Sequence, residues 1–183
     1  KVKPEAVINV GIGNVSLPAN TAMQKRMFAL DAPDSPFAKG VIRYTTTAGT
    51  QECQDAFRNI LECEGFDTSK LHLQVTDGGS AAMELLLIGA CGPAGTDESP
   101  LLMIDPAYTN YISFAQRTGR KTVTVKRNLD ESGKFTLPEF DKIEEIIKEH
   151  KPGALLVIPY DNPTGQLYDY DAMKELAKLC VKY

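Results

Sequence analysis

The chain has 183 residues, of which 43% are hydrophobic and 24% are charged, and its formal net charge is -4. This composition is typical of an ordinary globular protein, and it excludes a disordered chain, a collagen and a coiled coil. The net negative charge argues against nucleic acid and acidic membranes as partners, because both bind basic surfaces.

The first part of the chain predicts two different kinds of structure. Residues 1–40 are punctuated by proline and glycine, and because these residues interrupt regular elements we predict an extended arm and an irregular connection. Residues 50–65 predict an amphipathic helix that Gly65 ends. The inward face of this helix is predicted to consist of Ala56, Phe57, Ile60 and Leu61.

From residue 71 onward, strand-like apolar runs alternate with helical patterns, as in a parallel α/β sheet. Ligands of such sheets bind in the loops that follow the carboxyl ends of the strands. The loops after residues 75, 104 and 158 are therefore the places to look for a site. The predicted strands are 71–75, 101–104, 122–125 and 154–158, and the predicted helices are 80–90, 110–118, 137–149 and 169–183.

The cysteines show neither a metal-binding nor a disulfide pattern. The four cysteines have no C-x-x-C spacing and the two histidines lie far apart, so we expect no metal site and free, buried thiols. The sequence shows no secretory signal and no apolar run long enough to span a membrane. A cytoplasmic protein is the expectation. The cysteines are Cys53, Cys63, Cys91 and Cys180.

The first candidate loop is glycine-rich and could bind a phosphate. In Gly78-Gly79-Ser80 the glycines let the backbone approach an anion, and the N–H groups of the first helical turn would point at it. The Ser80 hydroxyl could add a hydrogen bond, or it could simply cap the helix. A P-loop is not expected, because no Gly-Lys-Ser/Thr follows, and Ser16 replaces the third glycine of a dinucleotide fingerprint after Gly11 and Gly13.

The other two loops offer an aromatic ring and an amide. Tyr108 could stack on an aromatic ligand, or it could pack at a loop edge. Asn162 begins the run Asn-Pro-Thr-Gly, which could be a turn and nothing more, but its amide could also offer a donor and an acceptor to a ring-bearing ligand. The three loops converge at one edge of the predicted sheet, and this convergence favours a site.

In this order the motifs resemble the amino-terminal half of the class I and II aminotransferases, a fold-type I family that uses pyridoxal 5'-phosphate. The resemblance covers nearly the whole chain and implies an α/β fold, the large domain of a fold-type I transferase, truncated, with an amino-terminal arm. Its mainly parallel sheet would be flanked by helices. Residues 1–40 would form the arm and a small-domain segment, and residues 41–183 the first, incomplete part of the cofactor-binding large domain.

The resemblance also implies roles for single residues. Gly78-Gly79-Ser80 matches the family's phosphate cradle, and Tyr108 stands where a ring stacks on the pyridine of the cofactor. Asn162 matches the residue that hydrogen-bonds the phenolic oxygen of the pyridine.

Two further residues resemble parts of the family's site that lie near the amino terminus. Gly13, in the stretch Val7–Asn14, would lie near the substrate carboxylate. Tyr44, in the stretch Arg43–Gly49, would reach across a homodimer to the cofactor phosphate of the neighbouring subunit.

The implied activity is transfer of an amino group between an amino acid and a 2-keto acid. In the family a lysine downstream of Asn-Pro-Thr-Gly holds the cofactor as a Schiff base, an aspartate pairs with its pyridine nitrogen, and an arginine grips the substrate carboxylate. None of these can be placed here, so we assign no catalytic residue. Because the chain begins at Lys1 and stops within a predicted helix, we expect it to be a piece of a longer polypeptide.

Three alternatives stay open at this point. The first is another fold-type I enzyme, such as a carbon–sulfur lyase. The second is a non-catalytic regulatory module, which a DNA-binding segment before Lys1 would favour. The third is an α/β domain without a ligand, whose glycine turns are only structural.

Overall fold

The computed structural model describes residue 13 and residues 16–183. The chain divides into two compact units, Lys1–Thr46 and Thr47–Tyr183, which we treat separately. The predicted domain boundary lies at residue 40; compactness alone does not assign domains, so that division stays a prediction.

The first unit contains a helix that the sequence pattern did not indicate. Helix α1 spans Thr21–Phe28 and is capped by Asn20, whose side chain accepts a hydrogen bond from the Ala22 N–H at 2.8 Å. Asparagine is among the best residues for this position, because it pairs an N–H that the helix cannot satisfy. The prediction of an entirely irregular connection was therefore wrong for residues 21–28. None of the α1 residues is buried.

The second unit is built on a three-stranded parallel sheet in the order β2-β1-β5. Its central strand is β1, Leu101–Asp105, and its neighbours are β2, Thr122–Lys126, and β5, Ala154–Leu156. Leu101 pairs in register with Thr122 on one side and with Ala154 on the other. These three predicted strands are confirmed, although β5 ends two residues early.

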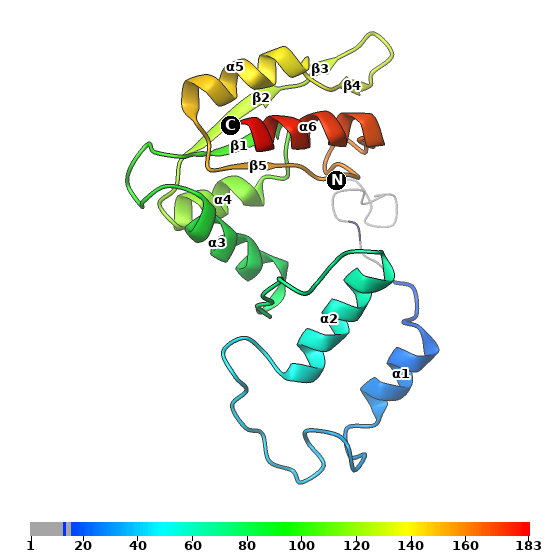
Figure 1. Ribbon diagram of the computed structural model, residues 1–183. Helices are drawn as coiled ribbons and strands as arrows, with labels where there is room; N and C mark the ends of the chain where they lie inside the picture. The colour runs from blue at the N-terminus through cyan, green and yellow to red at the C-terminus, as the bar shows by residue number, and fades with distance from the viewer. Residues whose placement is uncertain (1–12, 14–15) are drawn as a thin grey trace, which may run out of the picture. The chain divides into compact units, whose positions relative to one another are not determined.

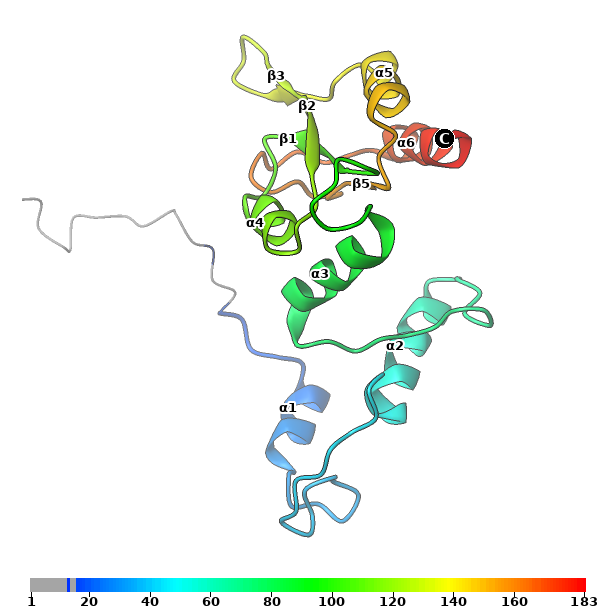
Figure 2. The ribbon, with the colours of Figure 1, turned by 90° about the vertical axis from the view of Figure 1, so that its left-hand side faces the viewer.

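Helices cover both faces of this sheet (Figure 1). Helices α3, Gly78–Ala90, and α4, Asn110–Arg117, lie against each other on one face. Helices α5, Phe140–His150, and α6, Tyr170–Lys182, lie side by side on the other. Figure 2 shows the strands between these two layers. All four helices were predicted, with ends that differ by up to three residues.

The side chains of β1 alternate between two apolar cores, as the two-residue period of a strand requires. Leu101 and Met103 join the core beneath α3 and α4, whereas Leu102 and Ile104 join the core beneath α5 and α6. All four side chains are buried. A continuous apolar run is what a strand covered on both faces needs.

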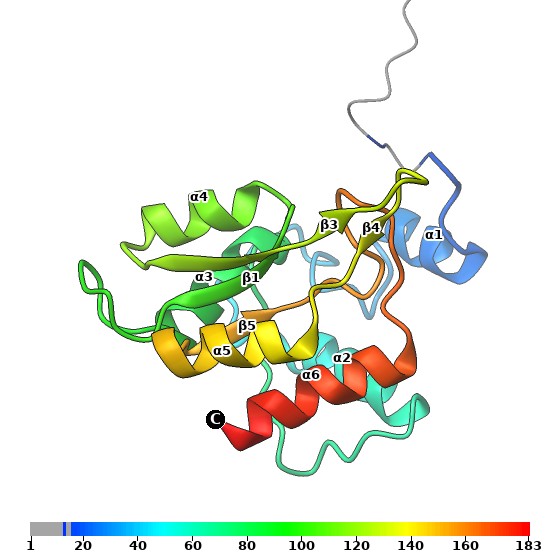
Figure 3. The same ribbon diagram turned by 90° about the horizontal axis from the view of Figure 1, so that it is seen from above.

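Two short strands follow β2 without having been predicted. Strands β3, Asn128–Leu129, and β4, Phe135–Thr136, form an antiparallel hairpin beyond the end of β2 (Figure 3). Asp130 holds the turn, because its carboxylate accepts hydrogen bonds from the N–H groups of Ser132 and Lys134, each at 2.9 Å.

The predicted strand 71–75 and the predicted inward face of the 50–65 helix were wrong. Residues 71–75 are not a strand, and among the described residues no strand pairs with them; Val75 donates its N–H to the Ala48 carbonyl at 3.0 Å. Helix α2, Gln51–Cys63, is present, but it buries no residue, and Phe57 is 52% exposed. An apolar face and an extended run both need a neighbour to become core, and sequence periodicity does not show whether that neighbour exists.

The cysteines are all free, but only Cys91 is buried. The expectation of buried thiols was wrong for Cys63 and Cys180, which are exposed.

Within residue 13 and residues 16–183, no cluster of His, Cys, Asp and Glu could hold a metal ion. In the same part of the chain, every helix is too short or too polar to cross a membrane.

Candidate functional site

The loops that carry Tyr108 and Asn162 leave the same edge of the sheet. Strands β1 and β5 are adjacent and parallel, so their carboxyl ends point the same way. Tyr108 lies in the loop from β1 to α4, and Asn162 lies in the loop that follows β5. The predicted convergence therefore holds for these two loops, at the position where open parallel sheets bind ligands.

Tyr108 is held in place while part of its ring stays accessible. The Asn110 amide donates a hydrogen bond to the Tyr108 hydroxyl oxygen at 2.6 Å, and the Tyr111 ring meets the Tyr108 ring edge-on, with centroids 5.6 Å apart. Tyr108 nevertheless remains 38% exposed. A ring that is fixed by contacts but open to solvent can stack on a planar ligand without losing much side-chain entropy.

Asn162 lies at the tip of a closed turn. The Gly165 N–H donates to the Asp161 carbonyl, and the Asp161 N–H donates to the Gln166 carbonyl, each at 2.8 Å. Gly165 has a φ of +69°, a conformation that glycine adopts without strain. Asn162 itself is exposed, so its amide is available to a ligand.

The glycine-rich segment forms the amino terminus of α3. Gly78 has a φ of +78°, and the Thr76 hydroxyl donates to its carbonyl at 3.0 Å. Ser80 is the third residue of the helix, so the interpretation of Ser80 as the helix cap was wrong; Asp77 holds that position, without a side-chain bond. A Cβ added at Gly79 would meet no atom within 4 Å. The Gly78 N–H donates to the Thr76 carbonyl at 2.9 Å. The next N–H groups lack partners within the helix, as at any helix amino terminus, and this is the kind of position that can bind an anion.

Behind the Asn162 turn lies a buried polar cluster, the Arg127 cluster, formed by Arg127, Asp161 and Tyr168. The Arg127 Nη2 lies 3.1 Å from the Asp161 Oδ1, and the two side chains are 0% and 4% exposed. Arg127 also donates to the Tyr168 hydroxyl, and its guanidinium lies over the Tyr168 ring at 4.9 Å. Thr164 donates its hydroxyl proton to the Asp161 carboxylate.

Burial is the main cause of the shifted pKa values of two tyrosines at this edge of the sheet, Tyr168 and Tyr111. The pKa of Tyr168 is raised to about 12: burial is the main cause, the Arg127 charge opposes the change, and the Asp161 charge adds to it. Burial also raises the pKa of Tyr111, and Tyr108 and Asp161 add to that effect. Both tyrosines are therefore neutral hydroxyl donors at neutral pH.

The sequence analysis did not identify the Arg127 cluster. A usable signal was present, since Arg127 lies two residues after one predicted strand and Asp161 lies three residues after another. Opposite charges at the ends of neighbouring strands can pair. The pairing across β1, however, depends on the strand order, which the sequence pattern left open.

Comparison with known proteins decides which family these features belong to. The family described as aminotransferase class I and II matches residues 5–183. The chain belongs to the class I and II aminotransferase family.

Two curated aminotransferases are similar to parts of the chain. The 2-aminoadipate transaminase of Thermus thermophilus is 32% identical over 59% of this chain and 25% of its own length. The aspartate/prephenate aminotransferase of Thermus thermophilus is 27% identical over 84% of this chain and 38% of its own length. The chain thus spans less than half the length of these curated relatives.

Solved structures show the same fold. An aminotransferase from Eubacterium rectale superposes with a TM-score of 0.72 at 23% identity, covering 93% of this chain and 41% of that protein. A carbon–sulfur lyase from Staphylococcus hominis, described as bound to pyridoxal phosphate, superposes with a TM-score of 0.65 at 19% identity, covering 80% of this chain and 36% of that protein. These likenesses confirm the predicted fold-type I architecture.

Two residues that the aminotransferase resemblance singled out lie in the first unit. Tyr44 is fully exposed, which leaves its ring free for a partner. Gly13 is described, whereas most of the stretch Val7–Asn14 around it lies outside the described residues. The roles of both residues stay predictions, as do those of the residues in the second unit.

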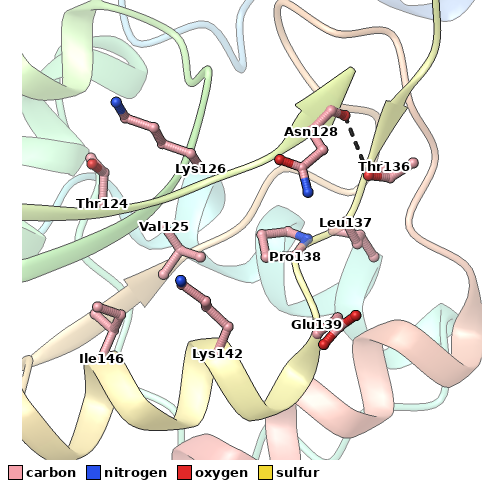
Figure 4. A pocket seen from close by; sticks show the side chains of 10 residues that line it. All are labelled: Thr124, Val125, Lys126, Asn128, Thr136, Leu137, Pro138, Glu139, Lys142 and Ile146. Carbon is pink, nitrogen blue, oxygen red and sulfur yellow. Dashed lines mark hydrogen bonds between the residues drawn. The ribbon is translucent and has the colours of Figure 1, made fainter. Parts of the chain in front are cut away.

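One pocket of this aminotransferase-family chain lies away from the Tyr108 and Asn162 loops. It has a volume of about 650 Å³ and lies between β2, the β3–β4 hairpin and α5. Lys142 reaches into it from α5, whereas Lys126 points away (Figure 4). It contains none of the predicted site residues. Its lining consists of Thr124, Val125, Lys126, Asn128, Thr136, Leu137, Pro138, Glu139, Lys142 and Ile146.

Proposed function

We propose that the protein containing this chain is a pyridoxal 5'-phosphate-dependent aminotransferase that moves an amino group between an amino acid and a 2-keto acid. The observation that carries the proposal is the meeting of the Tyr108 loop and the Asn162 turn at the carboxyl edge of the sheet, in a chain that belongs to the aminotransferase family. The pyridoxal phosphate described in the Staphylococcus hominis lyase supports the choice of cofactor.

The residues present suit this cofactor. The N–H groups at the start of α3, with the Ser80 hydroxyl, would hold its phosphate, since Gly78-Gly79 leaves open space there. The accessible ring of Tyr108 would lie against the pyridine, and the exposed amide of Asn162 would donate to its phenolic oxygen. When bound, pyridoxal phosphate supplies an electron sink for the charge that develops at the substrate's α-carbon.

These side chains bind and orient, and none of them moves the proton of the reaction. Tyr108 and Asn162 would fix the plane of the ring, and the α3 amino terminus would fix the phosphate, so that the reacting end of the cofactor has one position. We place the remaining chemistry on residues outside this chain.

We further propose a homodimer in the cytoplasm. Tyr44, whose ring is fully exposed, would reach the cofactor phosphate of the second subunit, and Gly13 would lie near the substrate carboxylate. The free cysteines suit a reducing compartment.

The test uses the complete polypeptide that contains this chain. Pyridoxal phosphate is titrated into the cofactor-free protein, and keto-acid formation is then measured with amino acids, with and without a 2-keto acid acceptor. Formation that requires the acceptor supports an aminotransferase. Release of ammonia or thiol without the acceptor would show a lyase. Cofactor binding without turnover, together with a DNA-binding segment before Lys1, would show a regulatory module, and absence of binding would leave only a structural domain.

A further inference from the structure

We infer that Arg127 is a positioning residue that joins the Tyr108 loop to the Asn162 turn and so sets the spacing of the two groups that would hold the cofactor ring. The effect on cofactor binding rests on the proposed function, whereas the contacts of Arg127 with the two loops are a property of the fold. Arg127 would not touch the cofactor; it would act through Asp105 and Asp161.

The backbone of Arg127 holds the start of the Tyr108 loop. Arg127 is the first residue after β2, and its N–H donates to the carbonyl of Asp105, the last residue of β1, at 2.8 Å. The Asp105 carboxylate in turn accepts from the Ala107 N–H at 3.3 Å. The segment that leads into Tyr108 is therefore attached by its backbone to the end of β2, and the Asp105 side chain closes a local turn within it.

The side chain of Arg127 holds the Asn162 turn. Strand β1 lies between β2 and β5, so the guanidinium passes the end of β1 to reach Asp161, the residue before Asn162, at 3.1 Å. The same nitrogen meets the Tyr168 hydroxyl. The Tyr168 N–H donates to the Pro159 carbonyl at 3.0 Å, so one cation contacts both ends of the 159–168 loop.

The buried ion pair of Arg127 and Asp161 is better suited to fixing the relative position of the two loops than to stabilising the fold. Burying two charges costs nearly as much as their attraction returns, and an apolar pair of similar volume would stabilise a fold equally well. The Arg127 Nε and Nη1 are buried without a hydrogen-bond partner among the described residues. Asp161 is therefore the main compensation for this charge. What the ion pair adds over an apolar pair is a fixed distance and direction between the two loops.

The experiment measures loop order in the complete, cofactor-free polypeptide. The double variant Arg127→Met/Asp161→Leu removes both charges and leaves neither unpaired, so it should still fold. The control is Arg117→Met, which removes an arginine of the same unit from an exposed pair with Glu84. Amide hydrogen exchange is followed in segments 105–111 and 159–168 and, as an internal reference, in α5.

In the double variant segment 159–168 should exchange about tenfold faster than in the wild type, because it loses its contact with the guanidinium. Segment 105–111 and α5 should be unchanged, because Arg127→Met keeps the backbone N–H that donates to the Asp105 carbonyl. The Arg117→Met variant should match the wild type. Unchanged exchange in segment 159–168 would overturn the inference. An equal acceleration in α5 would overturn it too, because it would show general destabilisation.

A second measurement separates this inference from the proposed function. Titration with pyridoxal phosphate should give a dissociation constant about tenfold higher for the double variant than for the wild type or Arg117→Met. If the wild type does not bind pyridoxal phosphate, the proposed function fails, and the exchange result alone decides whether Arg127 joins the loops. If segment 159–168 exchanges faster and the wild-type affinity is retained, Arg127 does not position the cofactor groups.

Discussion

The Arg127 guanidinium lies 3.1 Å from the Asp161 carboxylate, in the interior of the second unit. Arg127 follows β2 and Asp161 follows β5, the two outer strands of the sheet, and β1 lies between these strands. A buried pair of opposite charges here links the turn that carries Asn162 to the strand that precedes the hairpin.

The first prediction concerns the stability of this pair. Arg127→Met or Asp161→Asn should each lower the free energy of unfolding by about 3–5 kcal/mol, because each leaves one buried charge without its partner. The double variant Arg127→Met/Asp161→Leu should recover most of this loss. Urea unfolding of the complete polypeptide measures all three, and a double variant as unstable as the single ones would contradict the explanation.

Tyr168 gives a prediction for alkaline pH. Its pKa is raised from 10 to about 12, mainly by burial, so the folded state favours the neutral phenol. The stability that this contributes is fully present below pH 10 and is lost as pH rises from 10 through 12. Relative to Tyr168→Phe, the wild type should therefore lose up to about 2 kcal/mol across this interval. Unfolding curves at several pH values test this, and a difference that does not vary with pH would refute it.

Glu144 gives the opposite pH dependence. Hydrogen bonds from Lys182, Tyr183 and Lys148 lower its pKa from 4.5 to about 2. The bonds from Lys182 and Tyr183 connect α5 to the end of α6. Because the folded pKa is lowered, the contribution to stability is present above pH 4.5 and is lost as pH falls through 2. The wild type should exceed Glu144→Gln in unfolding free energy at pH 6, and this advantage should vanish towards pH 2. Added salt should reduce it at pH 6.

Replacement of Gly153 and of Gly89 by alanine should change the free energy of unfolding in opposite directions. A Cβ on Gly153 would lie 2.0 Å from the Ala90 carbonyl oxygen, whereas a Cβ on Gly89 would meet no atom within 4 Å. Gly153→Ala should cost about 3 kcal/mol or more, because backbone must move to admit it. Gly89→Ala should stabilise α3 by about 0.5–1 kcal/mol through helix propensity. Thermal unfolding of the two variants provides the comparison, and equal effects would show that the close approach at Gly153 is not real.

The proposed cofactor contacts can be tested side chain by side chain. Asn162→Ala and Tyr108→Ala should each weaken pyridoxal phosphate binding about tenfold, the effect of losing one hydrogen bond or one ring contact of about 1.4 kcal/mol. Asn128→Ala, which removes an exposed asparagine of the β3–β4 hairpin, is the matched control. Equal affinity in all four proteins would remove Tyr108 and Asn162 from the site.

Much of the second unit follows from local patterns in the sequence. The apolar run at 101–104 and the helical periods of 80–90 and 169–183 correspond to β1, α3 and α6. Parallel strands place their carboxyl ends together, so the common edge of the Tyr108 and Asn162 loops followed from the same reasoning.

Other features depend on contacts between residues far apart in the chain. Residues 71–75 have the composition of a strand, yet pairing requires a neighbouring strand, and the described residues supply none. Phe57 lies on an apolar helix face and remains exposed for the same reason. Arg127 and Asp161 pair only because β1 lies between β2 and β5. Local periodicity therefore determined which segments are helices and strands and which loops carry polar groups, whereas the order of the strands decided which charges meet and which apolar surfaces are covered, because burial is a property of neighbours in space.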